Sequence, residues 1–591
     1  MPNLGTQLSG IQLRPYLLSA LLFALSYPSF PWIRLEVLAW VWMVPMLRAL
    51  RSVESFWRFI LLAGVTMLSG WTIAMSWLAW GNAVGAMAIV VLVSVVTTVP
   101  FAVFYVIQKA LGRRWALLTL PVVWTAWEWC YQNVDGMVAW PGIAVTQHKL
   151  TWLIQYIDIT GMWGIVFWLV SLNVLIVMAV ENRGQGTGDR EQGIETEDQV
   201  PGLGREVAHS ILHSSFSILH SQFFILNSSF SILHSSFIRR LGLIAVVMFG
   251  PPLLYAAFIF SQTDPSAGGQ SIRVMVVQPN IDPWQKSSPE IRQKVVGSLV
   301  DQTNQVLNTT TARPDLIVWP EVAVPVPLLQ DEFAREFVFR NVARWNIPVV
   351  TGTIDVRTVV PGNPQPTRIK ASKPKNELFN AAVLLTPIQT ELGHRQTVSS
   401  EPYRKRKLMP FTEEVPYAKR FPVLSKLAID LNWNKEFNRG DRSTVFSFPT
   451  HQGNQVTVAT PICYEHFYPS LMAEFVRKGA QVITLLSNDA WFSKSHGEYQ
   501  IAAFTTLRAI ETRRSIVRCT NTGLTCFIDR FGRISQTIPW WQEDVAVADI
   551  ALSNQTSLYV RFPDAFPKLC FCGVIVLGLA AGLNRMSFLN S

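Results

Sequence analysis

The sequence predicts two structural units, a multi-pass α-helical membrane bundle of about eight spans and an α/β domain outside the membrane. The chain has 591 residues, which is more than one hydrophobic core usually organises. It is rich in Trp (22) and Phe (34), only 15% of it is charged, and the charges concentrate in the second half. In that half, short Val- and Ile-rich runs alternate with helical stretches, which indicates a layered α/β domain.

The N-terminal part supplies most of the expected membrane spans. A hydrocarbon layer roughly 30 Å thick needs about 20 apolar residues in a helix. Six apolar runs lie within 1–182, and two more lie at 239–262 and 567–585. The first run lacks a cleavage site and leads at once into another, so we expect an anchor and not a removed signal peptide. The spans are expected near 15–30, 35–50, 59–80, 86–108, 116–130, 161–180, 241–260 and 569–583.

Basic residues predict how these spans are oriented, because Lys and Arg are retained on the cytoplasmic side. They gather in alternate connections, whereas the opposite connections hold little beyond Arg34 and Lys149. Both termini are therefore expected in the cytoplasm, and the long segment before the last span is expected outside the membrane. The residues that carry this prediction are Arg48, Arg51, Arg58, Lys109, Arg113, Arg114, Arg239, Arg240 and Arg585.

Residues 183–238 interrupt the pattern of spans. A polar stretch rich in Gly and Glu is followed by a sevenfold period, HSSFSIL, HSQFFIL, NSSFSIL and HSSFIRR. A coiled coil is the less favoured interpretation, because Ser, aromatic and β-branched residues dominate where helix formers are needed. We expect a low-complexity cytoplasmic insertion without a catalytic role, whose His residues are repeat units and not metal ligands.

Composition argues against several other classes of protein. The net charge of +10 is not gathered into a basic stripe with interleaved aromatics, so we expect no nucleic-acid partner. Cys130, Cys570 and Cys572 lie in apolar runs, which leaves little for a disulfide framework. We expect Cys519 and Cys526 to be inert core residues. No CxxC pair or His/Cys spacing suggests zinc, so we expect neither a metal nor a cofactor.

Residues 271–560 form the expected α/β domain, and three of its motifs carry a reactive side chain beside a short apolar run. Glu321 closes IVWPEVAVP, Lys405 lies in YRKRKLMPFTEEVP, and Cys463 closes VATPICYEHF. Catalytic groups of α/β folds gather at strand ends. A solvated basic loop is the alternative for Lys405. We expect strands near 272, 315, 347, 380, 455 and 480, and helices at 289–308, 331–345, 469–478 and 498–512.

The three motifs, in this order, resemble the carbon–nitrogen hydrolase (nitrilase) superfamily, whose fold is an αββα sandwich with a Glu, Lys, Cys triad. The flanking spans, with SNDAWF at 487, NTG at 521, YVRFPD at 559 and the WEW and GMVAWPG segments, narrow the resemblance to the membrane-bound apolipoprotein N-acyltransferase family. The resemblance implies a multi-pass protein of the bacterial inner membrane with its catalytic domain on the periplasmic side. We expect it to act as a monomer.

The resemblance also implies a role for each matched residue. Cys463 would be the nucleophile, Glu321 the general base, and Lys405 the cation that stabilises the tetrahedral oxyanion. A free thiol has a pKa of about 8.5, so we expect the base and the cation to favour the thiolate. The supporting residues that match the family are Glu413, Tyr464 and Glu465.

The implied reaction is a two-step acyl transfer from a membrane phospholipid, through a thioester, to the α-amine of a diacylglyceryl apolipoprotein. Water must be kept from the thioester, so we expect an apolar cleft lined by Phe411, Trp491 and Phe492. The family has a Trp nine residues after the Gln of its QxNI motif, where this chain has Ser287; Trp284 is the candidate to replace it.

Two rival functions stay open. One is a membrane-tethered amidase of the nitrilase type, which would use the same triad to hydrolyse a small amide. The other is a transporter or scaffold with a degenerate nitrilase domain.

Glu128 is a further candidate for a functional residue, because an ionisable group in an apolar span is usually functional. An interfacial location beside Trp127 and Trp129 is the milder interpretation.

Overall fold

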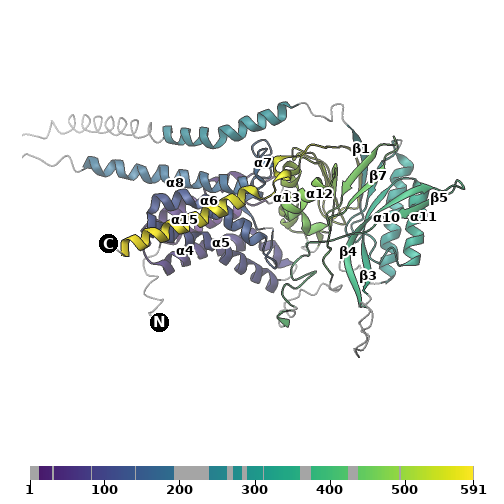
Figure 1. Cartoon of the computed structure of the whole chain (residues 1–591), viewed down its shortest axis with the longest axis horizontal. Coiled ribbons are helices and arrows are strands. Elements are labelled where there is room, and N and C mark those ends of the chain that lie inside the picture. Colours follow the sequence, from purple (N-terminus) through teal and green to yellow (C-terminus); the bar gives the residue numbers. More distant parts are fainter. Residues whose placement is uncertain are drawn as a thin grey trace, which may run out of the picture.

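A helical bundle and a two-sheet domain lie end to end in this protein, as Figure 1 shows for the computed structural model. The chain passes through the bundle first, crosses into the sheet domain, and returns along the bundle with its last helix. The structure describes residues 12–28, 32–80, 83–139, 141–191, 238–262, 270–282, 289–310, 312–359, 375–418, 420–422, 437–490 and 494–589.

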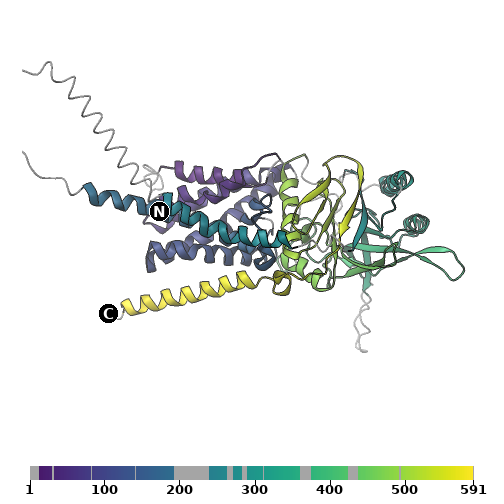
Figure 2. The same ribbon diagram turned by 90° about the horizontal axis from the view of Figure 1, so that it is seen from above.

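Among the described residues, seven long helices make up the bundle, and Figure 2 shows them side by side. Four segments are long and apolar enough to cross a membrane by length and composition, namely Phe56–Ala74, Ala83–Leu111, Trp163–Asn182 and Ile238–Ser261. They coincide with four of the eight expected spans. The seven helices are α2 (Arg14–Ser26), α4 (Phe56–Ala74), α5 (Ala83–Leu111), α6 (Arg113–Gln132), α8 (Trp163–Glu191), Ile238–Ser261 and α15 (Ala565–Leu589).

The single span expected at 35–50 is wrong. The chain there forms a short 3-10 helix, Glu36–Trp40, and then α3 (Met43–Ala49), which is too short to cross a bilayer. The side chain of Asn173 in α8 provides hydrogen-bond partners for the backbone between these two short helices. Its side chain accepts a hydrogen bond from Met43 N–H (2.9 Å) and donates one to Ala39 O (2.9 Å). Irregular backbone is tolerated at such a place because protein groups replace the missing helical partners.

The apolar span of helix α8 ends at Asn182, next to the expected boundary at residue 183. Helix α8 continues without a break to Glu191, beyond the membrane-spanning part that ends at Asn182. The remainder of the expected insertion, 192–237, lies outside the described residues.

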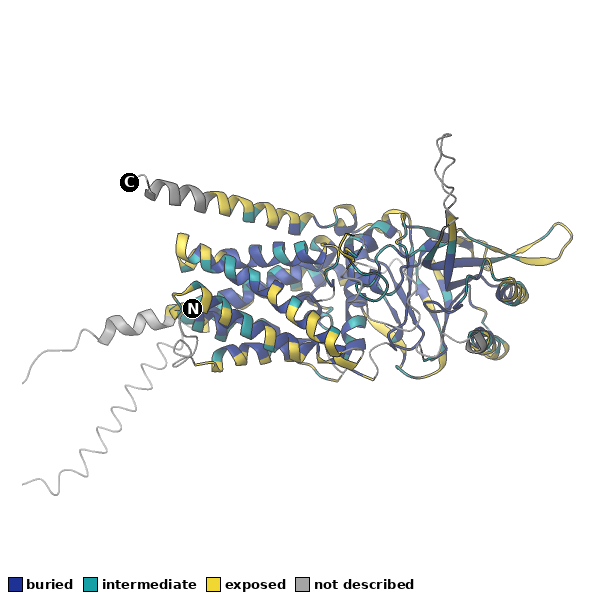
Figure 3. Cartoon of the chain, turned by 90° about the horizontal axis from the view of Figure 1, so that it is seen from below, coloured by how far each residue is buried: buried dark blue, intermediate teal, exposed yellow. Residues whose placement is uncertain are grey.

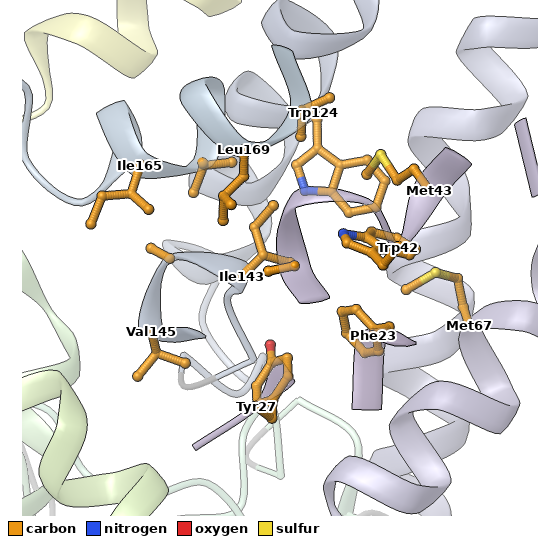
Figure 4. Close-up of a cluster of buried hydrophobic side chains, with 14 of the residues drawn as sticks. Phe23, Tyr27, Trp42, Met43, Met67, Trp124, Ile143, Val145, Ile165 and Leu169 are labelled. Carbon is orange, nitrogen blue, oxygen red and sulfur yellow. The ribbon is translucent and has the colours of Figure 1, made fainter. Parts of the chain in front are cut away.

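Aromatic and aliphatic side chains pack together at the centre of the bundle (Figure 4). Phe23 packs against Trp42 and Trp71 with ring centroids 4.9 Å apart in both pairs. Large exposed apolar residues such as Leu17, Val95 and Leu254 lie on the outer faces of the helices (Figure 3). An apolar exterior around an aromatic core is the pattern of a bundle surrounded by lipid.

Two β-sheets form the second domain. One has the order β13-β1-β2-β3-β4-β5, with β6 on β4, and the other has the order β12-β11-β10-β9-β8-β7. The first seven strands are β1 (Ser271–Gln278), β2 (Leu316–Val318), β3 (Val349–Val359), β4 (Lys375–Gln389), β5 (Arg395–Ser399), β6 (Tyr403–Arg404) and β7 (Val445–Pro449). The others are β8 (Gln455–Ala459), β9 (Val482–Ser487), β10 (Ile516–Thr520), β11 (Thr525–Ile528), β12 (Ile534–Ile538) and β13 (Asp544–Ala551).

Helices cover both outer faces of the paired sheets, so the expected αββα sandwich is confirmed. Helices α10 (Pro289–Thr309) and α11 (Glu332–Trp345) pack on the first sheet through apolar side chains such as Val338. The core between the sheets joins β1 and β2 to β8 and β9. Helices α12 (Pro469–Arg477), α13 (Gly497–Thr512) and α14 (Leu558–Arg561) lie on the opposite side, next to the bundle (Figure 1).

Helix α13 joins the sandwich to the bundle. Phe504, Leu507 and Ile510 belong to the same buried cluster as the aromatic centre of the bundle. Polar contacts add to this packing: Trp77 Nε1 donates to Gln500 Oε1 (3.0 Å), and Gln500 Nε2 donates to Ala74 O (2.8 Å). A shared core of this kind holds the two units in one fixed relation.

Candidate active site

Glu321 is positioned by the turn that follows β2. Gly352 of the neighbouring strand β3 lies directly under this turn, because a methyl group there would approach Val322 N to 2.5 Å and Pro320 O to 2.6 Å. Gly352 N–H also donates to Pro320 O (3.2 Å). Only a residue without a side chain fits this contact, so β3 fixes where the Glu321 backbone sits.

Cys463 lies at a sharp turn between β8 and a short 3-10 helix, Cys463–Phe467. Its φ of 48° places it in the left-handed region, which a residue with a side chain occupies only when its surroundings impose it. Glu465 supplies one such constraint, because its Oε2 accepts a hydrogen bond from Ile462 N–H (2.8 Å). Because β1, β2 and β3 are parallel and β8, β9 and β10 are parallel, strand ends bring Glu321 and Cys463 to one side of the sandwich.

Lys405 follows β6 and is almost fully buried, with 1% of its side chain exposed. Its backbone N–H donates to Asn380 O (2.8 Å), which anchors it to β4. The ammonium lies 3.2 Å from Glu321 Oε1 and 2.8 Å from Glu413 Oε2. These two carboxylates raise the pKa of Lys405 against the opposing effect of burial, so the side chain remains an ammonium. The alternative of a solvated basic loop does not fit this location.

Asn380 belongs to the same cluster, although its sequence context predicted no role for it. Its side-chain N–H groups donate to Glu321 Oε1 (2.8 Å) and to Glu413 Oε1 (2.9 Å). The two carboxylates are thus fixed by an amide and an ammonium together. A polar residue at the start of the apolar run NAAVLL was the signal that could have found it, because a buried amide on a strand needs a partner.

The site favours the thiol form of Cys463, contrary to the expected thiolate. Burial and the nearby Glu321 carboxylate raise its pKa to about 12, and Lys405 only partly offsets them. Burial also raises the pKa of Glu321. Ser487 lowers the Cys463 pKa by hydrogen bonding, whereas Asp489 raises it, so the SND motif that follows β9 lies beside the sulfur.

The residues after Cys463 hold the turn from two directions. Glu465 Oε1 accepts hydrogen bonds from Tyr403 OH (2.6 Å) and Arg406 N–H (2.7 Å), which ties the turn to the segment that carries Lys405. Tyr464 points the other way and accepts a hydrogen bond from Ala139 N–H (2.9 Å) of the bundle. Of the three expected supporting residues, Glu413 contacts the Lys405 ammonium, whereas Tyr464 and Glu465 hold the turn around the sulfur.

The expected lining residues are only partly described. Phe411 lies in the loop after Lys405, half-buried and with a φ of 65°, and its N–H donates to Glu414 O (2.7 Å). Trp284, Trp491 and Phe492 lie outside the described residues. Among the residues that the structure does describe, no group of three or more His, Cys, Asp or Glu side chains could hold a metal ion.

Comparison with known proteins gives two matches to protein families. Residues 270–559 match the carbon-nitrogen hydrolase family, and residues 19–175 match the apolipoprotein N-acyltransferase N-terminal domain. Together they span both units of the structure.

Relatives match over almost the entire chain. One from Chlorobaculum tepidum, named apolipoprotein N-acyltransferase, is 34% identical over 573 residues, which cover 96% of each chain. Another of that name, from Geobacter metallireducens, is 27% identical and covers 95% of this chain and 94% of its own. Because the likeness includes both the bundle and the sandwich, this chain belongs to the apolipoprotein N-acyltransferase family.

Proposed function

We propose that this protein moves an acyl chain from a membrane phospholipid to the α-amine of a diacylglyceryl-modified cysteine at the N-terminus of a lipoprotein. Membership of the family supports the overall reaction. One observation supports the chemical mechanism: the buried ammonium of Lys405 lies between Glu321 and Glu413. This cluster is close enough to Cys463 to affect the pKa of its thiol. Acyl transfer needs a nucleophile, a base and a cation in this proximity.

In the first step, the Cys463 sulfur attacks the ester carbonyl of the phospholipid while Glu321 takes the thiol proton. Lys405 faces the negative oxygen of the tetrahedral intermediate, where a fixed cation is worth a few kcal/mol. The carbon–oxygen bond then breaks, and the lysophospholipid leaves as an alcohol with the proton from Glu321. A thioester on Cys463 remains.

In the second step, the lipoprotein α-amine attacks this thioester and Glu321 accepts a proton from the amine. The carbon–sulfur bond breaks, an amide forms, and the proton returns to the sulfur. Because the Cys463 pKa is raised, the thiol is the stable end state of each cycle. The enzyme is thereby reset without a cofactor.

The bundle explains why such chemistry is attached to a membrane. Both substrates are anchored in lipid, so a site held at the bilayer surface meets them at a high effective concentration. The excess of basic residues in alternate connections supports a periplasmic location for the domain 271–560. We also propose that a single chain is the working unit.

Full-length protein in liposomes of labelled phospholipid tests the proposal. We expect a synthetic diacylglyceryl-cysteine peptide to gain one labelled acyl chain in amide linkage, seen by mass spectrometry, and we expect C463A to transfer none. Release of labelled fatty acid without amide formation would indicate a hydrolase and contradict the transferase. Amide formation that survives C463A would contradict the assigned nucleophile.

A further inference from the structure

We infer that Glu128, a carboxylate inside helix α6, is a positioning residue for Cys463. It acts through residue 139 and residues 141–143 of the loop after α6, which it holds against Tyr464, the residue after the nucleophile. This inference rests on the proposed function, because its effect is expected in the formation of the thioester.

Glu128 lies deep inside the bundle, with 2% of its side chain exposed. Trp124 Nε1 donates to its Oε2 (3.0 Å), and Gln132 Nε2 lies 3.5 Å from its Oε1. Gln132 Nε2 also donates to Pro141 O of the following loop (3.4 Å), so one amide touches both Glu128 and the loop. A carboxyl group in an apolar helix is costly, and here donors from its own helix face it. The milder interpretation of an interfacial, solvated glutamate does not fit this burial.

The loop touches Glu128 at close range. A methyl group at Gly142 would lie 2.9 Å from Glu128 Oε1 and 2.9 Å from Gln132 Nε2, so the loop backbone rests directly on these side chains. Two phenols fix the same stretch from its other side. Tyr27 OH donates to Gly142 O (2.9 Å), and Tyr131 OH donates to Pro141 O. Figure 4 shows Ile143 of this loop between Tyr27 and Trp124.

The far end of the loop reaches the catalytic turn. Ala139 N–H donates to Tyr464 OH (2.9 Å), and Tyr464 packs in the buried cluster of the bundle. Because Cys463 has a left-handed backbone, its neighbours must hold it in place. Glu465 holds the turn from the sandwich side, and Tyr464 holds it from the bundle side. Movement of the loop away from Glu128 would therefore loosen the turn that aims the sulfur.

Glutamine in place of Glu128 tests this link, because its NH2 group would face donors where the carboxylate accepts. The measurement is the single-turnover rate of thioester formation on Cys463, in full-length protein reconstituted with labelled phospholipid. The rate constant of a single turnover does not depend on the fraction of the protein that is folded. We expect E128Q to lower it about tenfold, as loss of one buried hydrogen bond predicts, with little change in the phospholipid concentration for half-maximal rate.

A double-mutant cycle separates positioning from a general effect on stability. Y464F removes the hydrogen bond between Ala139 N–H and Tyr464 OH. The double variant E128Q/Y464F should then acylate no more slowly than the slower of the two single variants. T125V is the matched control, because the Thr125 hydroxyl of α6 has no hydrogen-bond partner among the described residues, and we expect it to acylate at the normal rate. If E128Q does not fold, G142A keeps Glu128 and displaces the loop, and the same slowing is expected.

Two outcomes would overturn the inference: acylation by E128Q or G142A at the normal rate, or effects of E128Q and Y464F that multiply. Absence of any acyl thioester in the unmutated protein would instead contradict the proposed function. The two failures are thus distinguishable.

Discussion

Lys405 Nζ lies 3.2 Å from Glu321 Oε1 inside the sandwich, and both side chains are buried. An isolated charge at this depth would be strongly unfavourable, but each charge here stabilises the other. Glu413 and Asn380 complete the cluster. Lys405 therefore stays an ammonium, while the neighbouring carboxylate of Glu321 can still take up a proton. Acyl transfer to and from a thiol requires both a cation and a proton acceptor.

Replacement of Lys405 by methionine should abolish acylation and destabilise the protein. We expect a loss of at least about a hundredfold in the thioester-forming rate, because a fixed group that stabilises the oxyanion is removed. The free energy of unfolding should fall by about 3–5 kcal/mol, since Glu321 and Glu413 are left buried without their cation. The loss in free energy of unfolding should become smaller as pH falls, because protonation of one carboxylate removes the repulsion between Glu321 and Glu413. Thermal melts between pH 5 and 8 measure this.

Lys407 provides the control for that experiment. Its ammonium lies 4.7 Å from the centroid of the Tyr468 ring and not at the carboxylates. K407M should keep acylation within about tenfold of normal, in line with the loss of one cation–π contact. Equal loss in K405M and K407M would contradict the assignment of Lys405.

Removal of the Glu321 charge should speed the alkylation of Cys463 but slow acyl transfer through it. Glu321 raises the Cys463 pKa, so E321Q should lower that pKa and speed alkylation by iodoacetamide at pH 9. The same variant should lose acyl transfer by at least about a hundredfold, because no group takes the thiol proton. Peptide mass spectrometry after timed alkylation reports on Cys463 separately from the exposed Cys572. Slower alkylation in E321Q would contradict this.

In the unmutated protein, alkylation of Cys463 should keep rising with pH well beyond the range of an ordinary thiol. Burial and Glu321 raise its pKa to about 12. The thiol is ionised in the unfolded chain above about pH 8.5, yet stays protonated in the folded site. The free energy of unfolding should therefore decrease as pH rises from about 9 toward 12, and C463A should lack this component. A plateau in alkylation below pH 8 would contradict the raised pKa.

Alanine at position 352 should displace Glu321 without touching any charged group. The added methyl would approach Pro320 O to 2.6 Å, so the turn that carries Glu321 must move. We expect acylation to fall at least about tenfold, as loss of one well-placed catalytic contact predicts. G297A in α10 is the matched control, because a methyl there meets nothing within 4 Å, and it should be neutral or stabilising. Normal acylation by G352A would show that the turn has room to adjust.

The attachment of the sandwich to the bundle should depend on Arg513. Its guanidinium lies 2.8 Å from Asp158 Oδ2, and it donates to Gln155 O (2.8 Å), both on the bundle side. R513M should destabilise the protein by about 3–5 kcal/mol, since Asp158 would be left buried and unpaired. The exposed pair of Arg340 and Glu336 serves for comparison, and E336Q should change stability by less than about 1 kcal/mol. Thermal melts in detergent measure both.

Much of the sandwich could be predicted from the sequence, because buried parallel strands leave a strong apolar signal. The runs near 272, 315, 347, 380, 455 and 480 correspond to β1, β2, β3, β4, β8 and β9. The expected helix at 331–345 agrees with α11 to within one residue. Exposed antiparallel strands such as β5 and β12 were missed, since they are short and polar and resemble loops in composition. The buried strands β10 and β11 were missed as well.

Two features of the site could not be predicted because they depend on the fold. The break at 35–50 looks apolar and continuous, but side chains from other parts of the chain, including Asn173 and Gln147, hold its irregular backbone. The state of Cys463 was expected to be the thiolate, because the neighbouring charges were recognised but the depth of burial was not. Burial is the largest influence on its pKa, and sequence alone does not give it.

The central claim is that Cys463 carries the acyl chain between two lipid-anchored substrates. Full-length protein should be incubated with labelled phospholipid, digested, and examined for an acyl group on the peptide that contains Cys463. We expect a long-chain thioester that is cleaved by hydroxylamine, is absent in C463A, and passes to the α-amine of an added diacylglyceryl-cysteine peptide. An acyl group found on another residue, or a Cys463 thioester that water discharges while the peptide stays unmodified, would contradict the account.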